Sequence, residues 1–217
     1  MNTAYKTIAQ ASEIQHIVSK SRFIGRAWPV QDEEEALHRL ENIRKQHYDA
    51  SHNCYAYRIG ETGATARYSD DGEPGGTAGL PMMEVLLKKD VTNALCIVTR
   101  YFGGTLLGAG GLVRAYSHAC SSAIQKAQVL SMVLCDIYQL TLGYDKLGKL
   151  EYFLHTEGYA SDPFEYTEQV NATVYLPQAE SGRFLSGVSE LFDGSITPVP
   201  AGHCHRPMHT TNLSDGE

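Results

Sequence analysis

Two glycine-rich segments hold most of the residues in this chain whose types and spacing could do chemistry. The first, S-D-D-G-E-P-G-G-T-A-G-L-P, covers residues 69–81, and the second, R-Y-F-G-G-T-L-L-G-A-G-G-L-V-R-A-Y, covers residues 100–116. Eleven of the 20 glycines fall between Gly60 and Gly111. Glycine loses more backbone entropy on folding than any other residue, so this density requires positive φ angles or a close approach to the backbone. We therefore expect the functional site in this region.

The second segment has the composition of an anion-binding turn between a strand and a helix. Glycines in the first turn of a helix expose backbone N–H groups, and Arg100 and Arg114 could add positive charge. The spacing matches neither phosphate-binding fingerprint, because Gly108 is followed by Ala-Gly rather than Lys-Ser/Thr, and the third glycine of the dinucleotide motif is missing. The alternative is that these glycines let the helix pack closely against the sheet, and the sequence leaves both readings open.

The first segment concentrates acidic side chains in a turn-forming loop. Asp70, Asp71 and Glu73 could bind a hard divalent cation or supply a general base. The spacing is not that of a calcium-binding loop, and the same residues commonly cap a following helix or pair with an arginine such as Arg100. We favour capping and ion pairing, and we predict no metal and no cofactor.

His52 and Cys54 form a weaker candidate pair. They are two residues apart on a predicted strand and so point to the same side, which could bring an imidazole beside a thiolate. A packed cysteine and a hydrogen-bonded histidine are more common than such a pair. The chain has no G-x-S-x-G or H-E-x-x-H motif, and we assign no catalytic residue.

The first 130 residues predict a mixed α/β domain. The segment D-E-E-E-A-L-H-R-L-E-N-I-R places acids at the start of a helix and puts Ala36, Leu37, Leu40 and Ile43 on one face. The run Ala94–Phe102 is apolar on both faces and predicts a central strand. The other expected elements are three antiparallel strands at 5–9, 13–19 and 23–30, a strand at 52–59, a helix from Pro81 and a long helix at about 107–127.

The pattern changes after a boundary that we place at residues 129–133. Residues 133–202 read strand, helix, strand, strand, helix, strand, which is the ferredoxin-like order. Residues 203–217 lack periodicity and are expected to form a flexible tail. The predicted fold class is therefore α+β (α/β) in two domains, 1–130 and 133–202.

Charge and cysteine usage limit the partners and the compartment. Residues 1–130 contain 14 Lys+Arg against 13 Asp+Glu, whereas residues 131–217 contain 4 against 12. An acidic second domain is poorly suited to non-specific nucleic-acid binding, so any RNA contact must use the first domain, and no DNA partner is expected. The five cysteines form no C-x-x-C pair and no apolar run could span a membrane, which favours a reduced, cytoplasmic protein without a membrane partner.

The two glycine-rich segments, together with K-S-R-F-I-G at 20–25 and H-N-C at 52–54, resemble the IMPACT family, also called the YigZ family. The resemblance covers nearly all of residues 1–130, and the remainder is similar to the small C-terminal domain of bacterial members. It implies a first domain similar to the fourth domain of elongation factor G and a second domain similar to its ferredoxin-like fifth domain. Eukaryotic members are regulators of translation that act through protein contacts during amino-acid starvation and carry an additional N-terminal domain, which we do not expect in this protein.

Our leading hypothesis is a non-catalytic, translation-associated protein that contacts RNA, the ribosome or a protein partner through one surface built from both segments. The alternatives are an enzyme that holds a small anionic ligand there, with or without a divalent metal, and an adaptor that docks a protein through the acidic second domain. His52 and Cys54 are lower-ranked members of the surface. Its main members are Ser69, Asp70, Asp71, Gly72, Glu73, Pro74, Gly76, Thr77 and Gly79 of the first segment, and Arg100, Tyr101, Gly103, Gly104, Gly108, Gly110, Gly111, Arg114 and Tyr116 of the second.

Overall fold

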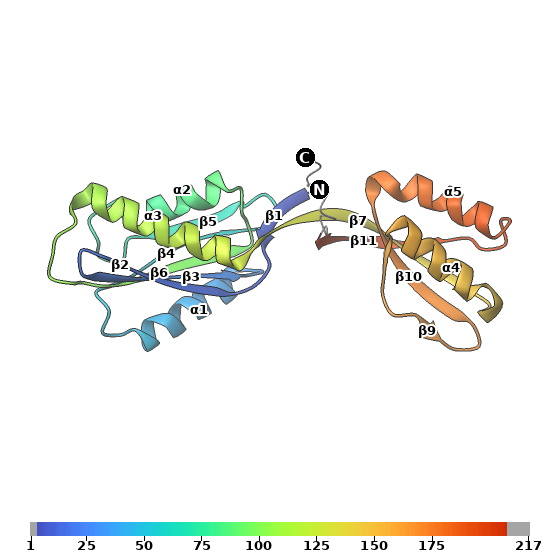
Figure 1. The fold of residues 1–217 in the computed structure, drawn as a ribbon, viewed down its shortest axis with the longest axis horizontal. Helices are drawn as coiled ribbons and strands as arrows, with labels where there is room; N and C mark the ends of the chain where they lie inside the picture. The colour runs from blue at the N-terminus through green and yellow to red at the C-terminus, as the bar shows by residue number, and fades with distance from the viewer. Residues whose placement is uncertain (1–3, 208–217) are drawn as a thin grey trace, which may run out of the picture. The chain divides into compact units, whose positions relative to one another are not determined.

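The computed structural model describes residues 4–207 as a mixed α/β protein with two sheets and five α-helices in that range. The chain divides into two compact units, Met1–Met132 and Val133–Glu217 (Figure 1). Within the described range, no helix is both long and apolar enough to span a membrane.

The first unit is built on an antiparallel sheet of five strands in the order β2-β3-β6-β4-β5. The central strand β6 is buried at every position except its last, as its apolar sequence predicts. A strand covered on both faces has no polar side to present to water, which is why the hydrophobic run is continuous. The strands are β2 (Ser12–Val18), β3 (Ser21–Pro29), β4 (His52–Ile59), β5 (Thr65–Ser69) and β6 (Ala94–Tyr101).

Helices cover both faces of this sheet. Helices α2 (Gly79–Lys88) and α3 (Gly108–Ala127) pack on one face, and α1 (Glu33–Gln46) packs on the other (Figure 1). The predicted α1 is confirmed, with Asp32 accepting a hydrogen bond from the backbone N–H of Glu35 at 2.8 Å. Of its four predicted core residues three are buried, whereas Leu37 is 46% exposed at the edge of the face.

Helix α3 lies unusually close to the sheet. A Cβ atom at Gly25 of β3 would lie 2.6 Å from the carbonyl oxygen of Ala119. The buried face of α3 is rich in alanine, including Ala115, Ala119 and Ala123. Small residues on both partners therefore allow this close helix–sheet contact, but its glycine, Gly25, lies outside the second glycine-rich segment for which the sequence offered that explanation.

Four loops of the first unit lie at the same end of the sheet, because β2, α1, β5 and β6 all end there. These loops are the β2–β3 turn at 19–20 and the segments 47–51, 70–78 and 102–107. In Figure 1 this end is at the left, and we call it the loop end. Both glycine-rich segments therefore contribute to one end of one unit.

The second unit has the expected βαββαβ order. Strands β7, β10 and β8 are neighbours in that order, β11 also pairs with β7 and β9 with β10, and the helices and sheet enclose a separate apolar core. This is the ferredoxin-like arrangement. The elements are β7 (Val129–Leu142), α4 (Tyr144–Glu157), β8 (Ala160–Ser161), β9 (Glu165–Tyr166), β10 (Val170–Pro177), α5 (Ser181–Leu191) and β11 (Val199–Pro207).

Three details differ from the sequence predictions. The first strand, β1 (Ala4–Ile8), does not join β2 and β3 but is the neighbour of β7, and the Thr92 backbone N–H donates to its Lys6 carbonyl at 2.8 Å. The short, exposed β5 was not anticipated. Residues 203–207 belong to β11 rather than to a flexible tail, because backbone pairing with β7 requires no side-chain periodicity. The rest of the predicted tail, 208–217, lies outside the described residues.

Candidate functional site

Asp70 organises the loop between β5 and α2. Its Oδ1 accepts hydrogen bonds from the backbone N–H groups of Ala78 at 3.0 Å and Gly79 at 2.8 Å, and its Oδ2 accepts one from Gly76 at 2.9 Å. Burial raises the pKa of the Asp70 carboxyl, but the three N–H groups outweigh it and hold the pKa below its ordinary value. Asp70 is therefore a charged cap at the start of α2, with both oxygens occupied.

Asp71 is also held by structural contacts. Its carboxylate accepts from the Asn53 backbone N–H at 2.7 Å and from the Arg44 guanidinium at 3.0 Å. Its carbonyl oxygen lies 2.9 Å from Nδ1 of His52. Among residues 4–207, no group of three or more His, Cys, Asp and Glu side chains is arranged to hold a metal ion.

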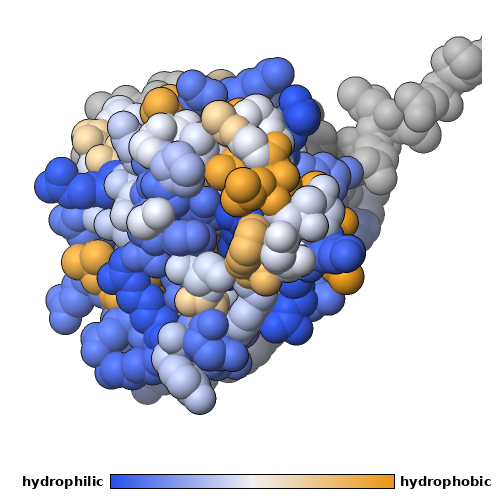
Figure 2. All heavy atoms as spheres, turned by 90° about the vertical axis from the view of Figure 1, so that its left-hand side faces the viewer, coloured by the Kyte–Doolittle hydropathy of each residue, from blue (hydrophilic) through white to orange (hydrophobic). Residues whose placement is uncertain are grey.

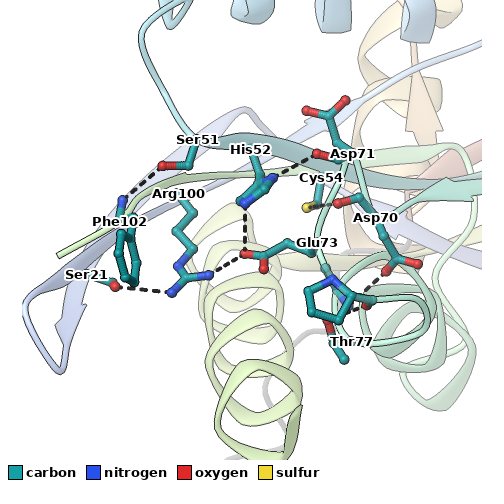
Figure 3. A network of polar contacts seen from close by, with 12 residues as sticks. Ser21, Ser51, His52, Cys54, Asp70, Asp71, Glu73, Thr77, Arg100 and Phe102 are labelled. Carbon is teal, nitrogen blue, oxygen red and sulfur yellow. Dashed lines mark hydrogen bonds and ion pairs between the residues drawn. The ribbon is translucent and has the colours of Figure 1, made fainter. Parts of the chain in front are cut away.

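Glu73 lies at the centre of a buried polar network (Figure 3). Its Oε1 accepts from the Arg100 guanidinium at 2.6 Å and from the Tyr116 hydroxyl at 2.7 Å, and it lies 3.8 Å from Nε2 of His52. The side chains of Glu73 and Arg100 are only 3% and 6% exposed. Arg100 also donates to Ser21 Oγ at 3.3 Å. This ion pair joins the two glycine-rich segments, one supplying the acid and the other the base.

The predicted neighbours His52 and Cys54 point to the same side of β4 but do not form a thiolate–imidazole pair. His52 faces Glu73, and the Cys54 thiol donates to the Asp70 carbonyl oxygen at 2.9 Å. Burial raises the pKa of the Cys54 thiol far above its ordinary value, and the nearby carboxylates raise it further. Cys54 therefore stays protonated and is not a nucleophile.

Two glycines are required because backbones approach each other closely. A Cβ atom at Gly79 would lie 2.6 Å from the carbonyl carbon of Ser69, and one at Gly103 would lie 2.1 Å from that of Lys20. Gly104 and Gly108 have φ angles of 81° and 69° but face open space. The glycines thus serve two purposes: close packing at the base of the loops and positive φ angles farther out.

The two loops meet around a pocket of about 340 Å³, which we call the loop-end pocket. Its polar groups are His52, Glu73 and Arg100, and its apolar wall includes Phe102 and Leu106. Figure 2 faces the loop end and shows an apolar patch within a mostly hydrophilic surface. The remaining lining residues are Gly72, Pro74, Leu107, Gly108, Ala109 and Leu112.

Several predicted site residues lie elsewhere. Tyr101 follows Arg100 in β6 and so faces the other side of the sheet, where its hydroxyl lies 2.9 Å from His47 Nδ1 and donates to Asp49 at 3.1 Å. Tyr116 is completely buried, so it cannot stack on a base.

Thr77 is also buried and donates to the Pro74 carbonyl at 2.6 Å. Arg114 is exposed and, with Gly111, lines a second pocket of about 290 Å³. Gly110 lies in the first turn of α3, where a Cβ atom would be 3.6 Å from the Arg114 guanidinium.

Sequence reasoning missed three contributors to this site. Ser21 Oγ accepts from the backbone N–H of Gly103 at 3.1 Å as well as from Arg100, and so ties β3 to the second loop. Phe102 and Leu106, at 49% and 87% exposed, form much of the accessible apolar surface. One signal was present, the apolar residues interspersed among the glycines of the second segment, but their exposure depends on tertiary packing.

Together, these observations define a two-unit α/β protein with a pocket at the loop end of its first unit. The Impact N-terminal domain model matches residues 19–124, and a domain of unknown function, DUF1949, matches residues 140–195. The chain belongs to the IMPACT family.

Similar proteins cover most of the chain. It is 40% identical to IMPACT family member YvyE of Bacillus subtilis over 88% of each chain. It is 33% identical to IMPACT family member YigZ of Escherichia coli, over 82% of this chain and 89% of that protein. A crystal structure of a hypothetical protein matches with a TM-score of 0.58 and 29% identity, over 93% of this chain and 98% of the other.

Proposed function

We propose that this chain is a non-catalytic protein of the translation apparatus that contacts RNA through the loop end of its first unit. The observation that carries the proposal is the gathering of exposed cations and aromatic rings at that end. Tyr48 is 85% exposed and Phe102 is 49% exposed. The exposed cations near them are Lys20, Arg22, Arg44, Lys45 and Arg114.

This combination suits single-stranded RNA. Cationic side chains neutralise phosphates irrespective of sequence, and exposed aromatic rings stack on unpaired bases. The Arg22 guanidinium lies 4.2 Å from the centre of the Tyr101 ring, which leaves a flat cation–aromatic pair beside the strand end. Residues 131–217, with 4 basic against 12 acidic residues, are unsuited to the same task.

The chemistry of the site supports binding rather than catalysis. Both oxygens of Asp70 accept backbone hydrogen bonds, and the Cys54 thiol is protonated. Glu73 is neutralised by Arg100, so the loop-end pocket offers little attraction to a small anion. Family membership supports the link with translation, because eukaryotic members regulate it.

The test compares two variants that lose equal charge. Replacing Lys20, Arg22 and Arg114 with alanine removes cations from the loop end, and replacing Lys6, Lys88 and Lys126 removes exposed cations distant from it. We expect wild type and the second variant to bind fluorescein-labelled oligouridine at about 50 mM salt and to sediment with ribosomes. The first variant should bind about 10- to 100-fold more weakly, with a shallower salt dependence. Absence of any association by the wild-type protein at low salt would overturn the proposal.

A further inference from the structure

His52 presents an unusual hydrogen-bonding surface to the loop-end pocket. Its Nδ1 lies 2.9 Å from the Asp71 carbonyl oxygen, and a carbonyl oxygen only accepts, so Nδ1 carries the proton. In the neutral ring, Nε2 is then an acceptor, and it lies 3.8 Å from Oε1 of Glu73. Oε1 already accepts from Arg100 and Tyr116, so the ligand-facing acceptors are His52 Nε2 and the second oxygen of the neighbouring Glu73 carboxylate, a pair complementary to a ligand with two neighbouring N–H donors.

The carboxylate of Glu73 also has an unused hydrogen-bond acceptor, which likewise favours a ligand with N–H donors. Arg100 and Tyr116 donate to Oε1, whereas no residue in the range 4–207 donates a hydrogen bond to Oε2. Because Arg100 already balances the charge, a second cation in the pocket would be repelled by the guanidinium. The donors that fit best therefore belong to an uncharged group.

Arg100 supplies the third polar feature. It lines the pocket and is 5% exposed, yet its Nε–H is buried without an acceptor in the described structure. A buried unsatisfied donor costs about 1–3 kcal/mol, so such a group calls for an explanation. That nitrogen is closed to solvent, but Nη1 and Nη2 each carry a second N–H beyond those given to Glu73 and Ser21, and a ligand carbonyl oxygen beside its N–H donors would accept from one of these.

The rest of the pocket suits a flat ring. Phe102, Leu106 and Pro74 provide apolar contact surface, and the Phe102 ring also lies 5.4 Å from the Arg100 guanidinium carbon. A volume of about 340 Å³ falls in the usual range for small-molecule pockets. Aromatic side chains of this kind stack on bases that have left a helix.

We propose that the loop-end pocket binds a single unstacked guanine base of RNA. Guanine carries neighbouring N1–H and N2–H₂ donors beside its O6 acceptor, which matches the acceptors on Glu73 and His52 and the donor on Arg100. Adenine, cytosine and uracil do not present two neighbouring donor groups on this edge. This inference rests on the proposed RNA contact and adds base selectivity to it, while the exposed cations hold flanking phosphates of any sequence.

The experiment measures fluorescence anisotropy of labelled UUUGUUU, UUUAUUU and a third oligonucleotide with inosine at the central position. We expect the guanine oligonucleotide to bind about 10-fold more tightly than the adenine one. Inosine, which keeps N1–H but lacks the 2-amino group, should bind with intermediate affinity. Equal affinity for all three would overturn the guanine pocket and leave the RNA contact intact, whereas no binding of any would overturn both.

Variants locate the selectivity. Glu73→Gln replaces one acceptor with a donor and should abolish the preference for guanine, with thermal unfolding used to confirm that the variant is folded. Phe102→Ala and Leu106→Ala change exposed side chains, so they should fold normally and lose the preference. Leu87→Ala, at a residue 53% exposed near the end of α2, is the matched control and should keep it. Equal weakening of all three oligonucleotides by Phe102→Ala, with the preference retained, would overturn the assignment.

Discussion

The two glycine-rich loops have similar compositions, and each contains one closely packed glycine, Gly79 or Gly103, but their side chains are used differently. In the β5–α2 loop, the carboxylate of Asp70 accepts three backbone N–H bonds, and Gly79 packs against the backbone of Ser69. In the β6–α3 loop, Leu106 is 87% exposed, and Gly104 and Gly108 face open space. The first loop uses its polar groups to hold itself together, while the second leaves side chains accessible.

This contrast shows that glycine content alone does not identify a binding loop. A loop with a structural role, such as the β5–α2 loop, satisfies its own hydrogen bonds, and we call it the supporting loop. A loop that contacts a ligand instead needs accessible side chains held by a rigid backbone. Glu73 belongs to the supporting loop by sequence, but it lines the pocket beside Phe102 of the other loop. The border between the two loops is therefore where the structural ion pair and the loop-end pocket coincide.

Breaking the ion pair between the loops should have the largest effect. Glu73→Ala leaves Arg100 buried without its partner and should reduce the free energy of unfolding by about 3–5 kcal/mol, measured by urea denaturation. The double variant Glu73→Leu with Arg100→Met replaces both charges with apolar groups and should recover most of that loss. A double variant as unstable as the single one would show that hydrogen bonds to Tyr116 and Ser21, rather than an uncompensated charge, dominate.

Removing the cap should weaken the supporting loop by a smaller amount. Asp70→Ala leaves three backbone N–H groups without their acceptor, and we expect a loss of about 2–3 kcal/mol at neutral pH. Because the pKa of Asp70 is lowered in the folded state, its contribution is present above the ordinary value of 3.8 and is lost as the pH falls further. The stability difference between wild type and variant should therefore shrink in acid, and a constant difference would contradict the capping role.

Replacing a glycine with alanine should show whether that glycine is needed for close packing or is only a typical loop residue. Gly79→Ala places its Cβ atom against the backbone of Ser69 and should cost about 1–3 kcal/mol. Gly75→Ala, in the same loop, meets nothing within 4 Å and should change the melting temperature little. Equal effects of the two substitutions would mean that the loop relaxes around Gly79.

The smallest predicted effect has the opposite sign. Gly110 lies in the first turn of α3, and its added Cβ atom would make only an ordinary contact with Arg114 at 3.6 Å. Gly110→Ala should therefore stabilise the protein by about 0.5–1 kcal/mol through the lower entropy of the unfolded chain. Thermal unfolding would measure this gain, and a destabilised variant would show that α3 needs a glycine here.

Strong periodicity and long apolar runs made most of the fold predictable. The buried face of α1, the central β6 and the βαββαβ order of the second unit follow from side-chain patterns. Strands β5 and β11 were missed or misplaced because their mostly exposed residues carry no such pattern. Their existence depends on a partner strand, and pairing is not encoded locally.

The site was predictable as a region rather than as a set of contacts. The Glu73–Arg100 pair is an ion pair of the kind that the acidic loop and the arginine suggested. Successive side chains of a strand point to opposite faces of the sheet, so Arg100 and Tyr101 lie on different faces. The composition of the segment does not show this separation. The burial of Tyr116 and the exposure of Leu106 come from tertiary packing, so no local pattern predicts them.

The position of β6 also constrains how the first unit can fold. In the sheet, β6 lies between β3 and β4, so Phe23 pairs with Arg100 and His52 pairs with that same residue from the other side. During synthesis, β3 and β4 emerge long before the strand that joins them, and neither can complete its ladder alone. A nascent chain must therefore keep two unpaired strand edges soluble until β6 arrives, and sheets with such distant pairing fold slowly. Chaperone dependence and slow refolding of the first unit would be expected from this strand order.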